Sequence, residues 1–483
     1  MNKGVSIEPK NLLIIVAQVV LFSLSLSAYG ENDYQIMLVY VVLSIFVNLV
    51  FCIFKIKQRF ILLLFVLTIF LFLVGRPYVE MIRKDNWWSV SSSEGIKNAL
   101  LSIQLVLSVL PVGGMTAKET NNIREGVLIE ERTITIGKIR MAALIIFILG
   151  LLGGVVDGFQ KMSYMTSHSY VEYYSEYTTS TPFVFKAFVR LLKPAMCLYL
   201  ATFPKKKMTI FVLISYILTT IPYIVVGMRS PTLLACLFSL SYFLLREFRY
   251  PNQERWVGKK EIIILLLAIP SLAIFAYSYN FIRQGKAYTI DNKVFLNFIH
   301  QQGISFQYLA QGFDVLDELP VKGLPGYMLG PLFDNIVYGT AIGRMIFNTK
   351  AIATQSMEAI SVGHDMKQHL SYALMGNGYF LGYGSGAIFI LEVIHDIGWL
   401  GLLVYSFFMG WFCVKIVDWF LSPKLIGNTI IIYSLLQIYY IARSDALSFL
   451  EHIINPYFWI AMIIIYTLSY FTPSFKVKLA VMR

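Results

Sequence analysis

Charged side chains are scarce in this sequence. Of its 483 residues only 14% are Asp, Glu, Lys or Arg, whereas 57% are hydrophobic; an ordinary soluble domain carries about 25% charged residues. No polar stretch outside one loop is long enough to form a soluble domain, and apolar stretches that can cross a ~30 Å hydrocarbon layer recur along the chain. The sequence therefore predicts an all-α, polytopic integral membrane protein with a single transmembrane domain over residues 1–483.

Cysteine and acidic residues are also few. The four cysteines all fall inside apolar runs, so neither a disulfide framework nor a zinc spacing is present, and we expect no metal and no cofactor. Asp and Glu number 28 against 40 Lys and Arg, which leaves a net charge of +12. Because the basic residues cluster in short loops between apolar stretches, this charge indicates membrane topology and not a nucleic-acid partner.

The apolar stretches predict about twelve transmembrane helices. The expected spans are 11–29, 35–54, 59–75, 98–115, 139–157, 184–203, 208–227, 230–246, 261–279, 386–414, 425–442 and 456–473. Both chain ends, together with the connections that lie on their side of the membrane, hold more than half of the basic residues. By the positive-inside rule, both termini are predicted to be cytoplasmic.

One connection stands out by its length. The loop 280–385 has about 105 residues, and a loop of that length is usually functional in a compact domain. On the predicted topology it is extracytoplasmic, and its apolar patches and Gly/Pro punctuation predict short helices that lie on the membrane and cap an outward cavity. No internal repeat of the kind found in many transporters is visible.

Basic residues at membrane depth are candidates for binding an anion, because a charge there is costly without a partner. Lys186, Arg190 and Lys193 lie within about 60° of one another on the helix 184–203. Such a face suits a lipid pyrophosphate, or alternatively allows the side chains to extend toward headgroups. Arg229 and Arg283 are expected at the outer rim, where a guanidinium binds phosphate oxygens bidentately or anchors to headgroups.

The segment 364–369 contains two candidate bases, His364 and His369, and a glycine-rich stretch at 376–386 that includes Tyr383 follows it. A histidine near its ordinary pKa can accept the proton of an attacking hydroxyl at neutral pH. The glycines allow the backbone to approach a substrate closely. The alternative for each histidine is an ordinary solvated loop residue.

Two further polar groups lie in apolar surroundings. Glu392, His395 and Asp396 share one face of the tenth predicted span, where a hydrogen-bonded structural network is favoured over a metal site. Arg443 and Asp445, at the outer end of the eleventh span, are expected to pair or to reach into the same cavity. The outer segment 163–180 is rich in tyrosine, which indicates an aromatic belt or a surface that stacks on sugars.

These features together resemble the O-antigen and capsular polysaccharide polymerases of the Wzy type. The local likeness lies in a run that contains His369, the stretch 379–386, Glu392, Asp396, Gly398 and Gly401, although Ile397 stands where the family usually has an aromatic residue. The resemblance implies a bacterial cytoplasmic (inner) membrane protein that polymerises undecaprenyl-pyrophosphate-linked oligosaccharide repeat units on the outer face of the membrane. Flippase and chain-length regulator proteins are candidate partners beside the lipid bilayer.

The resemblance also suggests roles for the candidate residues. Arg190, Arg229 and Arg283 would stabilise the charge on the departing pyrophosphate. His369, with His364 as second choice, would be the general base. The predicted substrate-binding residues are Lys186, Arg190, Lys193, Arg443, Glu392 and Tyr383. Three alternatives stay open at this point: an O-antigen-type ligase, a lipid-linked oligosaccharide flippase or transporter, and a membrane acyltransferase.

Overall fold

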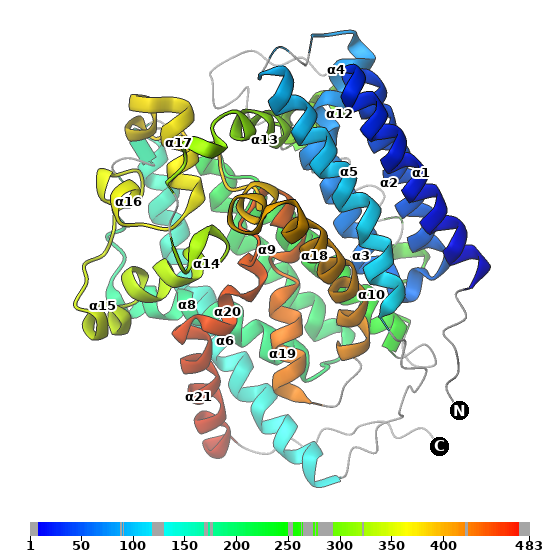
Figure 1. The fold of residues 1–483 in the computed structure, drawn as a ribbon. Coiled ribbons are helices and arrows are strands. Elements are labelled where there is room, and N and C mark those ends of the chain that lie inside the picture. The colour runs from blue at the N-terminus through cyan, green and yellow to red at the C-terminus, as the bar shows by residue number, and fades with distance from the viewer. Residues whose placement is uncertain are drawn as a thin grey trace.

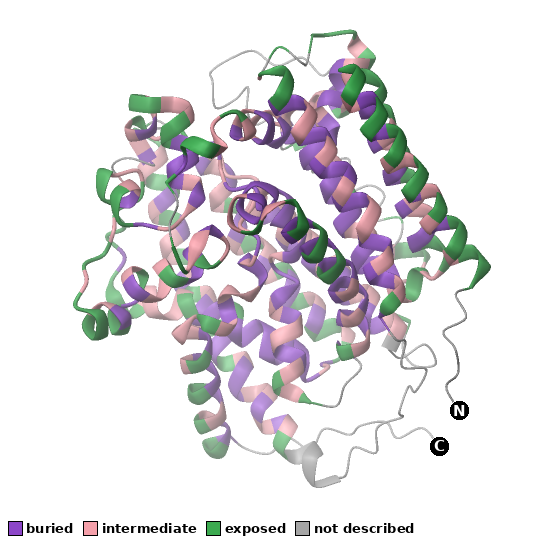
Figure 2. Cartoon of the chain, viewed as in Figure 1, coloured by how far each residue is buried: buried purple, intermediate pink, exposed green. Residues whose placement is uncertain are grey.

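The computed structural model contains helices and no strand in the residues that it describes. These are 8–86, 89, 91–117, 130–168, 172–173, 177–249, 255–261, 263, 274–275, 277–278, 293–320, 323–420 and 424–472. Its helices confirm the predicted fold class, an all-α polytopic membrane protein. Figure 1 shows the long helices as one bundle, and Figure 2 shows the exposed outer side of α1 and, on α18, an exposed face beside buried residues.

The first part of the bundle is joined by polar contacts inside apolar helices. It consists of α1 (Pro9–Glu31), α2 (Tyr34–Phe54), α3 (Ile56–Ile69), the π-helical η1 (Phe70–Val74), α4 (Gly75–Arg83) and α5 (Ser93–Thr116). Asn48 Nδ2 of α2 donates to the carbonyl oxygen of Leu107 in α5 at 2.8 Å, and Gln18 Nε2 of α1 donates to that of Ser44 at 3.1 Å. Such bonds link helices where lipid supplies no hydrophobic driving force.

Glycines allow the closest helix contacts. In the second part of the bundle, α6 (Glu130–Met165) packs on α8 (Phe183–Ala201), and α9 (Lys206–Val226) and α10 (Ser230–Arg249) follow. Against α5 lies α18 (Phe389–Phe420), and a Cβ added at Gly410 of α18 would lie 2.0 Å from the carbonyl oxygen of Leu110. Only glycine permits this approach, which is the small-residue packing typical of membrane helices.

The number of candidate spans is smaller than the twelve predicted. The described residues contain nine helices long and apolar enough to cross a membrane, or ten if a pair bent by 52° counts as one span. Two expected spans make the difference. The helix α8 exists, but its three basic residues lower its apolar character, and 261–279 lies mostly outside the described residues.

A set of short helices occupies most of the long predicted loop. They are α12 (Val294–Gln302), α13 (Ser305–Asp314), η3 (Leu316–Glu318), α14 (Gly326–Asp334), η4 (Asn335–Gly339), α15 (Ala341–Phe347), α16 (Met357–Ser361), α17 (Met366–Met375) and η5 (Gly376–Leu381). Asp314, at the end of α13, accepts from Ser92 N at 3.1 Å, and Tyr29, near the end of α1, donates to Glu94 at 2.6 Å. The end of α13 therefore lies at the membrane side where α1 ends and α5 begins.

The C-terminal part of the bundle is broken into short pieces. After α18 come α19 (Leu425–Ser434), η6 (Ile438–Arg443), η7 (Ser448–Leu450), α20 (Glu451–Ile454) and α21 (Pro456–Phe471). Within α18, Gly398 has φ 71°, a left-handed conformation that favours glycine. Irregular backbone at membrane depth is tolerated where protein or a cavity satisfies its polar groups. We therefore expect the irregular backbone between η6 and α21 to lie against protein or a cavity.

Candidate functional site

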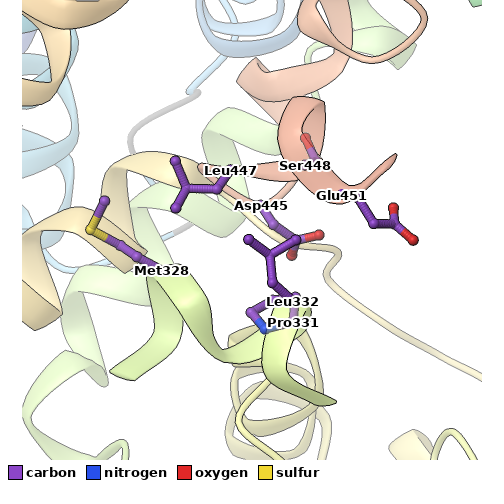
Figure 3. Close-up of a pocket in the computed structure, with 7 residues that line it drawn as sticks. All are labelled: Met328, Pro331, Leu332, Asp445, Leu447, Ser448 and Glu451. Carbon is purple, nitrogen blue, oxygen red and sulfur yellow. The ribbon is translucent and has the colours of Figure 1, made fainter. Parts of the chain in front are cut away.

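A pocket lies where α14 faces the broken segment between η6 and α20 (Figure 3). It has about 240 Å³ of free space, open solvent included, and is lined by Met328, Pro331, Leu332, Asp445, Leu447, Ser448 and Glu451. Figure 3 shows Asp445 between the side chains of Leu447 and Leu332. Two carboxyl groups thus face an otherwise largely apolar space.

A second hollow, with about 170 Å³ of free space when open solvent is included, lies beside the first along α20. This hollow is lined by Leu332, Asn335, Ile336, Glu451, Ile454, Asn455 and Pro456. Because both hollows share Leu332 and Glu451, they form one depression, which we call the α14–α20 groove. The groove runs from Asp445 to the first residue of α21, Pro456.

The carboxyl groups of the groove are held by specific partners. Asn335 Nδ2 donates to Glu451 Oε1 at 2.6 Å, which ties η4 to α20. Glu392, fully buried in the first turn of α18, accepts from the backbone N–H of Ala446 at 2.8 Å and hydrogen bonds with the Asp445 carboxyl group. Burial raises the pKa of Asp445 to about 6. Asp445 is therefore a carboxyl group that can exchange a proton near neutral pH.

A lysine and an aspartate from α17 act on the same end of the groove. Lys367 Nζ lies 2.8 Å from Asp365 Oδ2, and Asp365 also accepts from the Lys367 backbone N–H at 2.9 Å as the N-cap of α17. The Asp365 carboxylate is the main cause of a raised Lys367 pKa, and Asp445 adds to it. Lys367 thus stays charged beside Asp445.

Two cations of α8 interact with residues of α20 and α21 at the groove. Lys193 interacts electrostatically with Glu451 and with Tyr216 of α9. One turn away, Arg190 donates from Nη1 to the Tyr457 hydroxyl, and its guanidinium lies 4.4 Å from the centre of that ring. The same helix face carries Lys186, but its Nζ donates to the carbonyl oxygen of Thr179 at 3.0 Å.

Arg443 is a cation close in sequence to Asp445. It ends η6, two residues before Asp445, and is half-buried. Its guanidinium makes no hydrogen bond or ion pair within the part of the chain that the structure describes. A half-buried guanidinium of this kind is suited to an anionic ligand.

The two predicted histidines do not line the groove. His369 is only 2% exposed; its Nε2–H donates to the carbonyl oxygen of Ile360 at 2.8 Å. His364 lies with Nδ1 2.9 Å from Asp334 Oδ1, and its backbone N–H donates to Asp334 Oδ2 at 2.5 Å. These bonds hold the segment around α16 and α17 against the end of α14, so both side chains support the wall of the groove.

The predicted meeting of Arg190, Arg229 and Arg283 stays a prediction, because Arg283 lies outside the described residues. Arg190 contacts Tyr457 of α21, whereas Arg229 Nη1 donates to Gln301 of α12 at 3.3 Å. Helical periodicity predicts that the cations of α8 share one face. It carries no information about contacts between helices, such as the hydrogen bond from Arg229 to Gln301 of α12.

Tyr383 and the acidic face of α18 have separate roles. The side chain of Tyr383 is 54% exposed, and its carbonyl oxygen accepts from Gln355 Nε2 at 3.1 Å. Asp396 Oδ2 accepts from the Met328 N–H at the start of α14 at 2.7 Å, and Oδ1 lies 3.1 Å from His395 Nδ1. This is the hydrogen-bonded network expected for this face, and it fixes α14 to α18.

Sequence reasoning missed two charged residues of this site: Glu451, which lines the groove, and Lys367, which acts on Asp445. Glu451 offered one signal, an acidic residue between apolar stretches close to the last predicted span. Lys367 lies between His364 and His369 in the sequence, and the two histidines were interpreted as the functional residues of that segment. Within the described residues, no three His, Cys, Asp or Glu side chains are grouped closely enough to hold a metal ion.

The helices and the groove define a multi-pass membrane protein with a polar site at its broken C-terminal helices. The family described as O-antigen polysaccharide polymerase Wzy matches residues 13–473, nearly the whole chain, and the chain belongs to that family. Membership implies a membrane-embedded polysaccharide polymerase that acts on lipid-linked repeat units. No curated protein and no solved structure matches the chain.

Proposed function

We propose that the α14–α20 groove is the active site, at which repeat units carried on undecaprenyl pyrophosphate are joined on the outer face of the bacterial cytoplasmic membrane. The observation that carries the proposal is the pairing of cations and carboxyl groups along one groove. Lys193 interacts with Glu451, which lines the groove, Arg190 binds Tyr457, the residue after Pro456 of the groove, and Asp445 lies at its other end. Glycosyl transfer from a pyrophosphate needs both kinds of group.

The reaction follows from these chemical groups. A hydroxyl oxygen of the acceptor repeat unit forms a bond to the anomeric carbon of the donor sugar. The bond between that carbon and the phosphate oxygen breaks, and its electron pair leaves with the lipid pyrophosphate. Lys193, Arg190 and Arg443 stabilise this negative charge, since preorganised cations in a site of low polarity act strongly on developing charge. The hydroxyl proton passes to a carboxylate.

Asp445 is the better candidate for that carboxylate. It lines the groove, and its pKa of about 6 suits proton transfer near neutral pH. His369 was the choice from the sequence, but its ring is almost fully buried and Nε2 already bonds to a backbone carbonyl. We therefore assign the base to Asp445 and a supporting role to His369.

The outer face follows from charge and from the position of the short helices. The positive-inside rule predicts that α1 begins at the cytoplasmic side of the membrane. The end of α13 lies at the opposite side of the membrane, where α1 ends. The long loop that contains α14 and α17 then lies outside the cytoplasm, where no nucleotide sugar is available and a lipid-linked donor is required.

The test is charge removal on α8 in purified, reconstituted protein. Lys193→Ala and Arg190→Ala should each slow polymerisation roughly 10- to 150-fold, which corresponds to one lost charge-assisted hydrogen bond of about 1.5–3 kcal/mol. Lys186→Ala is the matched control, because Lys186 lies on the same helix but bonds to the Thr179 carbonyl. It should retain the wild-type rate.

The accumulated intermediate identifies the reaction. A failed polymerase leaves lipid-linked single repeats, whereas a failed ligase leaves finished lipid-linked polymer. The proposal that transfer takes place in the groove is refuted if polymerisation is equally fast in Lys193→Ala, Arg190→Ala and Lys186→Ala. A donor linked through a monophosphate should react more slowly than the pyrophosphate donor if the three cations act on both phosphates.

A further inference from the structure

The contact between Glu392 and Asp445 has an unusual hydrogen-bond arrangement. Glu392 Oε2 accepts the N–H of Ala446, the residue that follows Asp445. The remaining oxygen, Oε1, and Asp445 Oδ1 are both buried, and within the described residues neither has a donor group as its partner. The bond to Ala446 brings the Glu392 carboxyl group next to Asp445, and a side-chain hydrogen bond with Glu392 is one of the influences on the pKa of Asp445. Two carboxyl groups can meet only through their oxygens, so this contact is oxygen to oxygen.

Such a contact requires a proton. An ionised carboxyl group can only accept hydrogen bonds, so two carboxylates in contact have no donor and repel each other. The position of the proton follows from burial. Glu392 is 0% exposed, while Asp445 lines the groove. A charge is far more costly at the first position than at the second.

We propose that Glu392 is protonated and donates a hydrogen bond to the Asp445 carboxylate, which makes Glu392 a positioning residue that orients the base toward the groove and keeps it ionised. This inference rests on the proposed function, because it assumes that Asp445 accepts the acceptor's proton. The nearby Tyr405 does not supply the donor, since its hydroxyl donates to the Ala446 carbonyl at 2.6 Å.

Other charged groups act on Asp445 from neighbouring elements. Asp365 of α17 adds to the effect of burial in raising the pKa of Asp445, whereas Lys367 and the hydrogen bond with Glu392 lower it. Glu451 of α20 lines the same pocket. The resulting pKa of about 6 leaves Asp445 mostly ionised at pH 7. Without the donor from Glu392 that pKa would rise, and less of the base would be available at a given pH.

The first test observes the proton directly and needs no activity. Infrared difference spectra of purified protein at pH 7.5 should show a protonated-carboxyl C=O band in the wild type that is absent from Glu392→Gln. Glu94→Gln is the control: Glu94 is an exposed glutamate on α5 that pairs with Lys97 at 3.0 Å, and its removal should leave the band unchanged. A spectrum in which Glu392→Gln removes only carboxylate bands would overturn the proposal.

The second test separates positioning from general structural damage. Glu392→Gln keeps an N–H donor for Asp445, so its acid limb in the rate–pH profile should coincide with that of the wild type. Glu392→Leu removes the donor, and its limb should move to higher pH with kcat reduced and KM little changed. A limb that moves to lower pH in Glu392→Gln would mean that a negative charge had been removed, which contradicts a protonated Glu392.

The two tests also distinguish this inference from the proposed function. If Asp445→Asn polymerises at the wild-type rate, Asp445 is not the base and the proposed mechanism fails. The infrared band would still report whether the two carboxyl groups share a proton. Circular dichroism and size-exclusion elution of each variant establish that it is folded. Glu392→Gln preserves the volume of the buried side chain, so it remains informative even if Glu392→Leu does not fold.

Discussion

Asp445→Asn removes the base but changes little else. Asparagine keeps the size of the side chain and still fits beside Leu332 and Leu447, so the groove should retain its shape. Loss of a general base costs about 10²- to 10⁴-fold in rate. Asp445 has a pKa of about 6 in the wild type. The ionised fraction of Asp445 therefore falls from about nine-tenths at pH 7 to about one-tenth at pH 5, and the wild-type rate should fall roughly tenfold with it.

The assay is polymerisation in proteoliposomes with purified lipid-linked repeat units, followed by separation of the products by length at several pH values. Asp445→Asn should leave single repeats at every pH, and its small residual rate should lack the acid limb. Asp317→Asn is the matched control, because Asp317 is an exposed aspartate in η3, away from the groove. An unchanged rate and an unchanged acid limb in Asp445→Asn would refute the assignment of the base.

Three further predictions concern the scaffold. Gly410→Leu should abolish the folded protein, because even a Cβ there would lie 2.0 Å from a backbone oxygen. Gly30→Ala is the control: Gly30 has open space around it, so its thermal transition should be unchanged. Thermal unfolding of detergent-solubilised protein measures both variants. Asp396→Ala removes a carboxylate that accepts the N–H of Met328 and should cost about 1 kcal/mol or more in unfolding free energy; an equal midpoint would contradict this role. Met345 is 79% exposed and lies in α15, a helix of seven residues. A nitroxide attached to Met345→Cys should contact lipid in oxygen-accessibility measurements. A nitroxide exposed only to water would contradict the expectation that the short helices lie on the membrane.

Composition and local pattern were sufficient to determine the class of this protein. The long apolar stretches allow only helices to cross the membrane, since every backbone polar group must be satisfied within the chain. Eleven of the twelve expected spans therefore correspond to described helices or to the bent pair that ends in α21. The family was also visible in the sequence, through the run from His369 to Gly401.

The candidate site was predictable where helical periodicity controls direction. Arg190 and Lys193, three residues apart on α8, were expected on one face, and both interact with residues of α20 or α21. The acidic face of α18 was likewise expected to form hydrogen bonds, as Asp396 does. Periodicity carries this information because side chains three or four positions apart project from the same side of a helix.

Only the tertiary structure decided which polar side chains share the groove. The sequence pointed to His369 as the base and to Asp445 only as a partner of Arg443 or a cavity residue, but packing buries His369 against Ile360 and places Asp445 on the space beside α14. Glu451 faces Lys193 because helices from distant parts of the chain meet at a broken segment. The physical reason is that the protonation and the role of a polar group depend on its desolvation and on its partners, and both arise from contacts between residues far apart in sequence.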